Sequence, residues 1–299
     1  MKTAIVTGAA GFLGSHAVER LLADGYKVRA FDLDRARAET ALAAVAGDPN
    51  LSFEPLDVLD MEATDQRFAG AAFVFHCAGI ADHVQSLKMP EKYLRVHVSP
   101  LARVLEAARH HGVEKVIYPS SAAVYGRAEW PTREDHPIRP ESPYGLSKWM
   151  GEELIESWRR IFGVPGLSFR IFNGYGPRAE AGSVINFFIK KKLAGEPLTL
   201  TGDGSQRRDF IYVTDIVDAF VRGAESDVTG QTFNLASGTL HTVLDMARLI
   251  GGRIEFIPKR ANDPETICPD ISRIRAAFGW QARVSLDEGV RKTMKSYGL

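Results

Sequence analysis

The fold of this chain is decided close to its N-terminus, by the glycine-rich stretch Thr7-Gly8-Ala9-Ala10-Gly11-Phe12-Leu13-Gly14. The β-branched residues at 3–7 predict a strand that enters this stretch, and residues 12–24 predict a helix that leaves it. A glycine-rich turn between a strand and a helix is typical of dinucleotide-binding α/β domains. The stretch therefore predicts a Rossmann-type, doubly wound parallel sheet.

Each glycine of this stretch has its own predicted task. Gly8 permits the tight turn, Gly11 lets the backbone approach a pyrophosphate, and Gly14 allows the helix to pack closely on the strand. The amides at the start of the helix, at Phe12 and Leu13, are then expected to face the phosphates.

Residues that suit the remainder of a dinucleotide follow the next predicted strands. Asp32 ends the second strand, where a carboxylate binds the ribose hydroxyls of NAD and repels the 2′-phosphate of NADP. Arg35 and Arg37 lie close behind it, so the sequence favours NAD and leaves NADP open as an alternative. Asp57-Val58 is expected at the adenine edge, and Ala78-Gly79 is expected beside the adenosine ribose.

A second group of residues predicts hydride chemistry on a secondary alcohol or ketone. If the segment after Pro143 is helical, Tyr144 and Lys148 lie four residues apart and share one face. A free phenol has a pKa of about 10, and a nearby ammonium together with a positively charged nicotinamide would lower that pKa. Ser121 is then expected to bond the same substrate oxygen and to steady the proton being moved.

Charge and composition argue against several classes of protein. Lys plus Arg and Asp plus Glu number 37 each, so no net field attracts nucleic acid. No apolar run approaches the ~20 residues needed to cross a bilayer, and we expect no signal peptide. Cys77 and Cys268 are far apart and are interpreted as cytosolic thiols, and no metal-binding motif accompanies the eight histidines. We therefore expect a cytoplasmic protein that binds neither a metal nor a membrane.

Apolar periodicity predicts alternating strands and helices over the first 170 residues, and shorter elements after them. The predicted strands in the first part are residues 3–7, 27–31, 51–56, 73–75, 115–118 and 167–172. The predicted helices there are residues 12–24, 34–46, 61–67, 90–111 and 144–162. Later elements are helices at 184–194, 214–224, 242–250 and 286–296, and strands at 198–200 and 209–212. This pattern predicts a Rossmann domain over residues 1–173 and a smaller α/β substrate lobe over 174–299, with elements exchanged between them.

Four further stretches carry recognisable patterns. Residues 120–126 match SSxxVYG, residues 144–148 match YxxxK, residues 170–177 match RxFNxYGP, and residues 202–213 match GdGxxxRDFIYV. Together with the TGxxGxxG loop, they resemble the extended short-chain dehydrogenase/reductase family, in its sugar-nucleotide epimerase/dehydratase branch. The resemblance runs nearly end to end, and it implies that Tyr144 is the base and acid, Lys148 the ribose ligand and Ser121 its hydroxyl partner.

The resemblance also implies a site for a nucleoside diphosphate. Asn173, Arg208 and Arg260 would hold the diphosphate, and Asp263 would lie near the nucleoside ribose. Arginine suits this task because it supplies rigid, forked donors. The alternative for Arg208 is a surface ion pair with Asp209.

Departures from the family pattern bear on the reaction. Many dehydratases of the family place an Asp-Glu pair where this chain has Ala122 and Ala123, so elimination of water has no obvious acid and base. Some relatives that act on uronic acids have an arginine in the loop after YGP, where this chain offers Ser183. This favours a neutral hexose, although Arg178 is available as a substitute.

The family's NVxGT helix motif is replaced by His97-Val98-Ser99-Pro100-Leu101. Pro100 cannot donate to the Val96 carbonyl and predicts a kink. His97 either extends a proton relay or fills the space of the missing asparagine.

These observations favour an NAD-dependent sugar-nucleotide 4-epimerase, with UDP-glucose and UDP-galactose as its expected substrates. The main alternative is an NAD(P)H-dependent reductase of a 4-keto sugar nucleotide, and a non-catalytic dinucleotide sensor is a third hypothesis. The helices at 90–111 and 144–162 are too long and too apolar for only one face of each to be covered. In the family they form an intersubunit four-helix bundle, so we expect a homodimer.

Overall fold

The structure is a computed structural model that describes residues 1–179, 183–259 and 264–299. The chain divides into two compact units. Unit 1 consists of Met1–Gly126, Ile138–Arg170 and Val217–Phe233, and unit 2 consists of Arg127–Pro137, Ile171–Ile216 and Asn234–Leu299. Arg127–Pro137 thus belongs to unit 2 although it lies within the first half of the chain, and Val217–Phe233 belongs to unit 1 although it lies within the second half.

A seven-stranded sheet organises unit 1, in the order β3-β2-β1-β4-β5-β6-β11. Its strands are β1 (Thr3–Thr7), β2 (Lys27–Asp32), β3 (Leu51–Pro55), β4 (Ala71–His76), β5 (Lys115–Ser121), β6 (Gly166–Ile171) and β11 (Gln231–Leu235). The pairs β1–β2, β2–β3, β1–β4 and β4–β5 are parallel. The order of the first six strands is that of the Rossmann fold, so the predicted fold class is confirmed.

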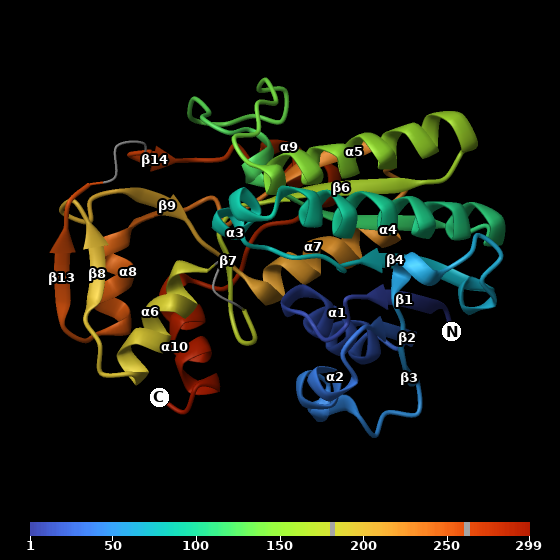
Figure 1. Cartoon of the computed structure of the whole chain (residues 1–299), viewed down its shortest axis with the longest axis horizontal. Coiled ribbons are helices and arrows are strands. Elements are labelled where there is room, and N and C mark those ends of the chain that lie inside the picture. Colours follow the sequence, from blue (N-terminus) through green and yellow to red (C-terminus); the bar gives the residue numbers. More distant parts are fainter. Residues whose placement is uncertain (180–182, 260–263) are drawn as a thin grey trace. The chain divides into compact units, whose positions relative to one another are not determined.

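Helices cover both faces of this sheet. They are α1 (Phe12–Ala23), α2 (Arg35–Ala41), α3 (His83–Lys88), α4 (Pro90–His111), α5 (Pro143–Phe162) and α7 (Val213–Glu225). Figure 1 shows α4 and α5 on one face and α1 and α7 on the other. Gly151 lets α5 approach β5 closely, because a Cβ atom there would lie 2.2 Å from the Tyr118 hydroxyl. The strands therefore bury apolar side chains on both sides, as a parallel sheet requires.

The helix predicted at 61–67 is wrong. Two 3-10 turns, Val58–Asp60 and Gln66–Phe68, flank an irregular segment instead. The Asp57 side chain accepts a hydrogen bond from the Leu59 amide, and Asp65 accepts one from the Arg67 amide. Such local bonds from aspartate to the backbone favour turns over a continuing helix.

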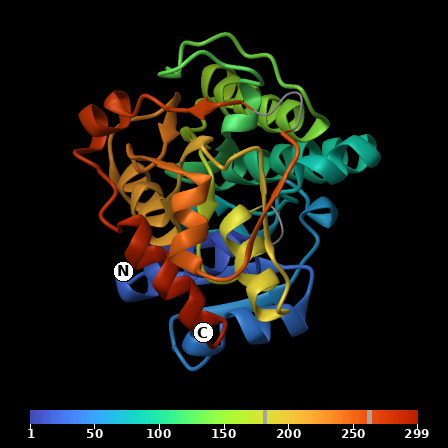
Figure 2. The same cartoon turned by 90° about the vertical axis from the view of Figure 1, so that its left-hand side faces the viewer.

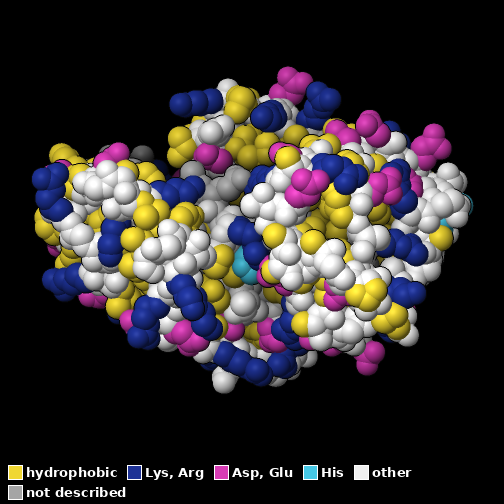
Figure 3. Space-filling view, turned by 90° about the horizontal axis from the view of Figure 1, so that it is seen from below, with side chains coloured by type: hydrophobic (Ala, Val, Ile, Leu, Met, Phe, Trp, Pro, Cys, Tyr) yellow, Lys and Arg dark blue, Asp and Glu magenta, His cyan; other side chains and the backbone are white. Residues whose placement is uncertain are grey.

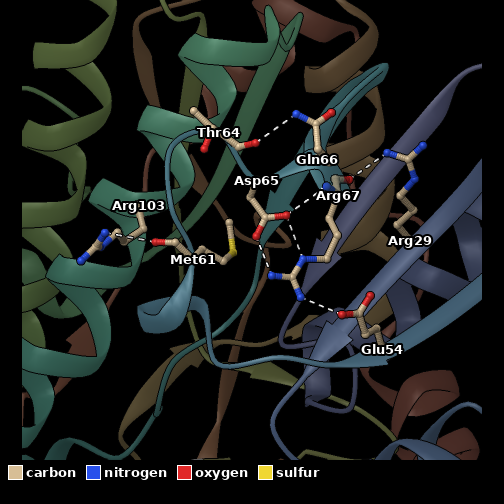
Figure 4. A network of polar contacts seen from close by, with 8 residues as sticks. All are labelled: Arg29, Glu54, Met61, Thr64, Asp65, Gln66, Arg67 and Arg103. Atoms are coloured by element: carbon tan, nitrogen blue, oxygen red, sulfur yellow. Dashed lines mark hydrogen bonds and ion pairs between the residues drawn. The ribbon is translucent and has the colours of Figure 1, made fainter.

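A polar network holds this irregular segment in place (Figure 4). Arg67 pairs with Asp65 and with Glu54 of β3, while Arg29 of β2 donates to the carbonyl of Arg67. On the other side, Arg103 of α4 donates to the Met61 carbonyl at 3.1 Å. The segment that carries Asp57 and Val58 is thereby tied to two strands and a helix.

The part of unit 2 that the structure describes contains short strands and helices, and three of these helices pack on one another. Its helices are α6 (Val184–Leu193), α8 (Val243–Ile250), α9 (Ser272–Phe278) and α10 (Leu286–Ser296). Its strands are β7 (Gly174–Tyr175), β8 (Leu198–Thr201), β9 (Arg207–Asp209), β10 (Ile211–Tyr212), β12 (Leu240–Thr242), β13 (Ile254–Ile257) and β14 (Thr266–Ile267). The helices α6, α8 and α10 contact one another (Figures 1 and 2).

The strand predicted at 209–212 is two strands in different sheets. β9 pairs with β12 and β14, whereas β10 pairs with β7, and Phe210 separates them. The sequence analysis predicted no element at β11, α3 or α9, nor at the short strands β7, β12, β13 and β14. The seventh strand of the sheet is therefore a feature that only the structure provides.

Acidic and basic side chains are interspersed on the face shown in Figure 3. Within the described ranges, no helix is both long and apolar enough to span a bilayer. Among the same residues, no three His, Cys, Asp or Glu side chains converge as a metal site would require.

Candidate active site

The glycine-rich loop is closed so tightly that Gly8 and Gly14 admit no side chain. Gly8 has φ +68°, and a Cβ atom there would lie 2.6 Å from the Ala78 amide nitrogen. A Cβ atom on Gly14 would lie 2.1 Å from the Gly8 carbonyl oxygen. The Gly11 amide donates to the same carbonyl at 3.0 Å. The loop therefore brings the start of α1 against the segment that follows β4.

Asp32 ties the end of β2 to this loop. One carboxylate oxygen accepts a hydrogen bond from the Ala10 amide at 2.9 Å, and the other accepts one from the Asp34 amide at 3.2 Å. The Leu56 amide donates to the Asp32 carbonyl at 2.8 Å, which places Asp57 next to it along the edge of the sheet. The predicted cofactor residues thus gather at the carboxyl ends of β1, β2, β3 and β4.

Ser121 and Tyr144 meet where β5 ends and α5 begins. Ser142 caps α5 by accepting a hydrogen bond from the Gly145 amide at 3.1 Å, and Pro143 occupies the first helical position. Tyr144 follows directly, and its phenol lies beside the Ser121 hydroxyl. Lys148 lies one turn further along, where its ammonium donates to the Pro119 carbonyl at 2.8 Å.

Burial disfavours the charged form of both Tyr144 and Lys148, and it therefore shifts their pKa values in opposite directions. It raises the pKa of the Tyr144 phenol, and the nearby Ser121 hydroxyl opposes that shift. It lowers the pKa of Lys148 to about 8, against the attraction of Cys77 and Glu152. The chain by itself therefore keeps the phenol protonated, and positive charge brought by a cofactor would favour the phenolate.

Two of the predicted substrate residues are described and lie close together in unit 2. The Asn173 backbone has φ +36°, and its side-chain amide donates a hydrogen bond to the Asp209 carbonyl at 2.8 Å. Arg208 directly precedes Asp209 in β9. The Asp209 carboxylate accepts hydrogen bonds from Ser237 and Gly238 at 2.7 Å, so it holds the turn between β11 and β12. Arg260 and Asp263 lie outside the described residues.

Comparison with known proteins agrees with this arrangement. The model of the NAD dependent epimerase/dehydratase family matches residues 4–236. The UDP-glucose 4-epimerase of Mycolicibacterium smegmatis is 37% identical over 308 residues, which cover 98% of this chain and 97% of the relative.

Solved structures of two further epimerases match over nearly the whole chain. The UDP-N-acetylglucosamine 4-epimerase of Methanobrevibacter ruminantium, in complex with UDP-N-acetylmuramic acid, is 30% identical with a TM-score of 0.92, covering 99% of this chain and 98% of that one. The UDP-glucuronic acid 4-epimerase of Bacillus cereus, in complex with UDP-glucuronic acid and NAD, is 27% identical with a TM-score of 0.91, covering 100% and 99%.

The chain belongs to the NAD-dependent epimerase/dehydratase family. The resemblance to extended short-chain dehydrogenases/reductases is thereby confirmed, and the protein is an NAD-dependent epimerase of that family. The geometry fits NAD as the cofactor: Gly8 and Gly14 permit the close backbone packing of a dinucleotide loop, and Asp32 offers a carboxylate for ribose hydroxyls beside that loop.

The epimerase also contains a buried ion pair beside Ser121 that the sequence analysis missed. The Glu152 carboxylate accepts hydrogen bonds from Arg170 at 2.7 and 3.0 Å and from Ser120 at 2.5 Å. Arg170 in turn donates to the Tyr125 hydroxyl at 2.8 Å. Glu152 lies four residues after Lys148, and this spacing in the helix was the only signal in the sequence that could have revealed it.

His97 and Pro100 are both buried in α4, which continues through Pro100 without a break in its bounds. The His97 ring lies edge-on to the rings of Tyr93 and Tyr144, at centroid distances of 5.8 and 5.9 Å. The residue that replaces the family's asparagine is therefore in direct contact with the predicted catalytic tyrosine.

Proposed function

We propose that the protein interconverts UDP-sugars that differ in configuration at C4, with UDP-glucose and UDP-galactose as its substrates. The observation that carries this proposal is the placement of the Tyr144 phenol beside the Ser121 hydroxyl, with Lys148 one helical turn away. The 4-epimerases named above, which act on three different UDP-sugars, support the UDP-sugar class.

In this proposal, the residues of the chain move one proton. Tyr144 accepts the proton of the C4 hydroxyl and later returns it, while Ser121 bonds the same oxygen and holds it in place. Bound NAD supplies reversible hydride exchange at C4. The Lys148 ammonium, positioned by the Pro119 carbonyl, binds the nicotinamide ribose and favours the phenolate electrostatically. Asn173 and Arg208 anchor the diphosphate, so that the sugar is free to turn and present its other face.

The residues next to Ser121 argue against a dehydratase. Ala122 and Ala123 form the 3-10 turn after β5, so methyl groups occupy the positions where a dehydratase needs an acid and a base. Ser183, directly before α6, carries a hydroxyl where some relatives that act on uronic acids carry an arginine. We therefore propose a neutral hexose in place of a uronic acid.

The test is to incubate the protein with NAD and UDP-glucose and to analyse the nucleotide sugars formed. Appearance of UDP-galactose supports the proposal, whereas a 6-deoxy-ketose refutes it. Parallel reactions with UDP-N-acetylglucosamine and UDP-glucuronic acid rank the substrates. Retention of NAD through purification distinguishes an epimerase from a reductase of 4-keto sugars, because the reductase releases oxidised cofactor in each cycle.

Tyr144→Phe tests the proton route directly. The variant should lose about 10²- to 10⁴-fold in kcat while NAD affinity stays nearly unchanged. Tyr93→Phe is the matched control, because the Tyr93 ring touches Tyr144 but its buried hydroxyl has no partner within the described part of the chain. Full activity of Tyr144→Phe would refute the proposed mechanism.

We also propose a cytoplasmic homodimer that forms through α4 and α5. A row of apolar side chains at helical spacing runs along α5, from Met150 through Leu154 and Trp158 to Ile161. Leu154 and Trp158 pack partly against the core, whereas Met150 and Ile161 are exposed. Light scattering that gives a monomer mass at micromolar concentration would refute the dimer.

A further inference from the structure

His97 connects two segments of unit 1 that are far apart in the sequence. Its Nε2 atom accepts a hydrogen bond from the Ile80 amide at 3.0 Å, in the segment that follows β4. Its Nδ1 atom lies 2.7 Å from the Ser147 hydroxyl oxygen in the first turns of α5. The Ser147 hydroxyl in turn donates to the Tyr144 carbonyl at 2.8 Å.

These contacts fix the tautomer of the ring. A backbone amide can only donate, so Nε2 must be the nitrogen without a proton. The neutral imidazole then carries its proton on Nδ1 and donates it to Ser147. The hydrogen bonds all run in one direction, from Ile80 through His97 and Ser147 to the Tyr144 carbonyl.

The surroundings of His97 hold the ring in this position. A Cβ atom on Gly79 would lie 2.7 Å from both Cδ2 and Nε2 of the ring, so the backbone of the segment after β4 rests directly against it. The ring is almost fully buried, and Lys148 and His76 are close enough to repel a positive charge. Both effects lower the pKa of His97 to about 2, which keeps the ring neutral.

We propose that His97 is a positioning residue that couples the segment 77–80, which is predicted to lie beside the ribose of bound NAD, to the first turn of α5, which carries Tyr144. This inference rests on the proposed role of Tyr144 and adds how that residue is held in register with the cofactor. A proton relay through His97 does not fit, because the series of hydrogen bonds ends at a carbonyl oxygen, which has no proton to pass on.

Two substitutions separate the two halves of this connection. The end of a glutamine side chain reaches the position of Nε2, so His97→Gln keeps an acceptor for Ile80 and loses the bond to Ser147. The end of an asparagine side chain reaches the position of Nδ1, so His97→Asn keeps the bond to Ser147 and loses the one to Ile80.

The two variants should therefore have opposite effects. His97→Asn should weaken NAD binding about three- to tenfold with kcat within about twofold of wild type, which is the range of one hydrogen bond. His97→Gln should keep NAD affinity and lower kcat about three- to tenfold. Ser147→Ala should lower kcat as much as His97→Gln does and should likewise keep NAD affinity. The double variant should lower kcat no more than either single change. His110→Gln and His110→Asn, on the exposed end of the same helix, are the controls.

A third measurement needs neither turnover nor a variant. ¹⁵N NMR of histidine-labelled wild-type protein at pH 7 should show His97 neutral, with its proton on Nδ1. A proton on Nε2, or equal losses of NAD affinity and kcat in both variants, would overturn the inference. Absence of epimerase activity would refute the proposed function instead, because NAD affinity and the tautomer are measured without turnover.

Discussion

The two ends of the predicted NAD site are held by different kinds of interaction. At the catalytic end, Glu152 and Arg170 form an ion pair whose side chains are 5% and 7% exposed. At the adenosine end, Arg67 pairs with Glu54 and Asp65, and the Arg67 and Glu54 side chains are 32% and 51% exposed. A buried charge that loses its partner has no water to turn to, whereas an exposed one does. The same chemistry therefore carries very different weight at the two ends.

The largest effect is expected from breaking the buried pair. Glu152→Gln leaves the Arg170 guanidinium buried without a carboxylate, and should lower the free energy of unfolding by about 3–5 kcal/mol. Urea denaturation at pH 7 measures this. Glu156→Gln, one turn further along α5 in an exposed pair with Arg159, should cost no more than about 0.5 kcal/mol. Equal losses in the two variants would remove the distinction between buried and exposed ion pairs.

The glycine loop offers the next largest effect. Gly8 and Gly70 have φ values of +68° and +69°, so an alanine at either should cost about 1–2 kcal/mol of backbone strain. Only Gly8→Ala also forces a Cβ atom against the backbone of residues 77–78, because Gly70 has no atom of the described residues within 4 Å. Calorimetric titration should show NAD binding lost in Gly8→Ala and kept in Gly70→Ala. NAD binding by Gly8→Ala at wild-type affinity would contradict this account of the loop.

Acid should lower the free energy of unfolding, because two buried histidines at the catalytic end stay neutral in the folded chain. Burial lowers the pKa of His97 to about 2 and that of His76 to about 3, from an ordinary 6.5. The unfolded chain therefore takes up protons that the folded chain refuses, so stability is full above pH 6.5 and is lost as the pH falls below it. Between pH 7.5 and pH 5.5, each of these two histidines should lower the free energy of unfolding by about 1 kcal/mol. In denaturation at both pH values, His97→Gln should shrink this loss and His110→Gln should leave it unchanged.

The smallest effect is expected at the adenosine end. Glu54→Gln removes the exposed pair with Arg67, and should lower the free energy of unfolding by about 0.5–1 kcal/mol. Thermal unfolding at low and high salt tests this, because screening should abolish most of the difference. A loss as large as that of Glu152→Gln would mean that the network in Figure 4 stabilises the fold as strongly as the buried pair does.

Sequence patterns predicted most of unit 1 because its elements are long and repeat every 2 or 3.6 residues. They failed for residues 61–67, where Asp57 and Asp65 bond to nearby amides and favour turns. They also missed β11, because Gln231–Leu235 has only two apolar residues, Phe233 and Leu235, whereas the equally long β1 has three. The local sequence thus predicts an element only when its apolar pattern outweighs its polar residues and their side-chain bonds.

The sequence by itself determined the dinucleotide loop, the placement of Tyr144 and Lys148 on one helical face, and the family. Each of these depends on residues within a few positions of one another, where covalent geometry and helical spacing settle the arrangement. The tertiary structure alone decided the pairing of Glu152 with Arg170 and the tautomer of His97. Both depend on which groups meet across tens of residues and on how much water is removed from them, and neither quantity is written in the local sequence.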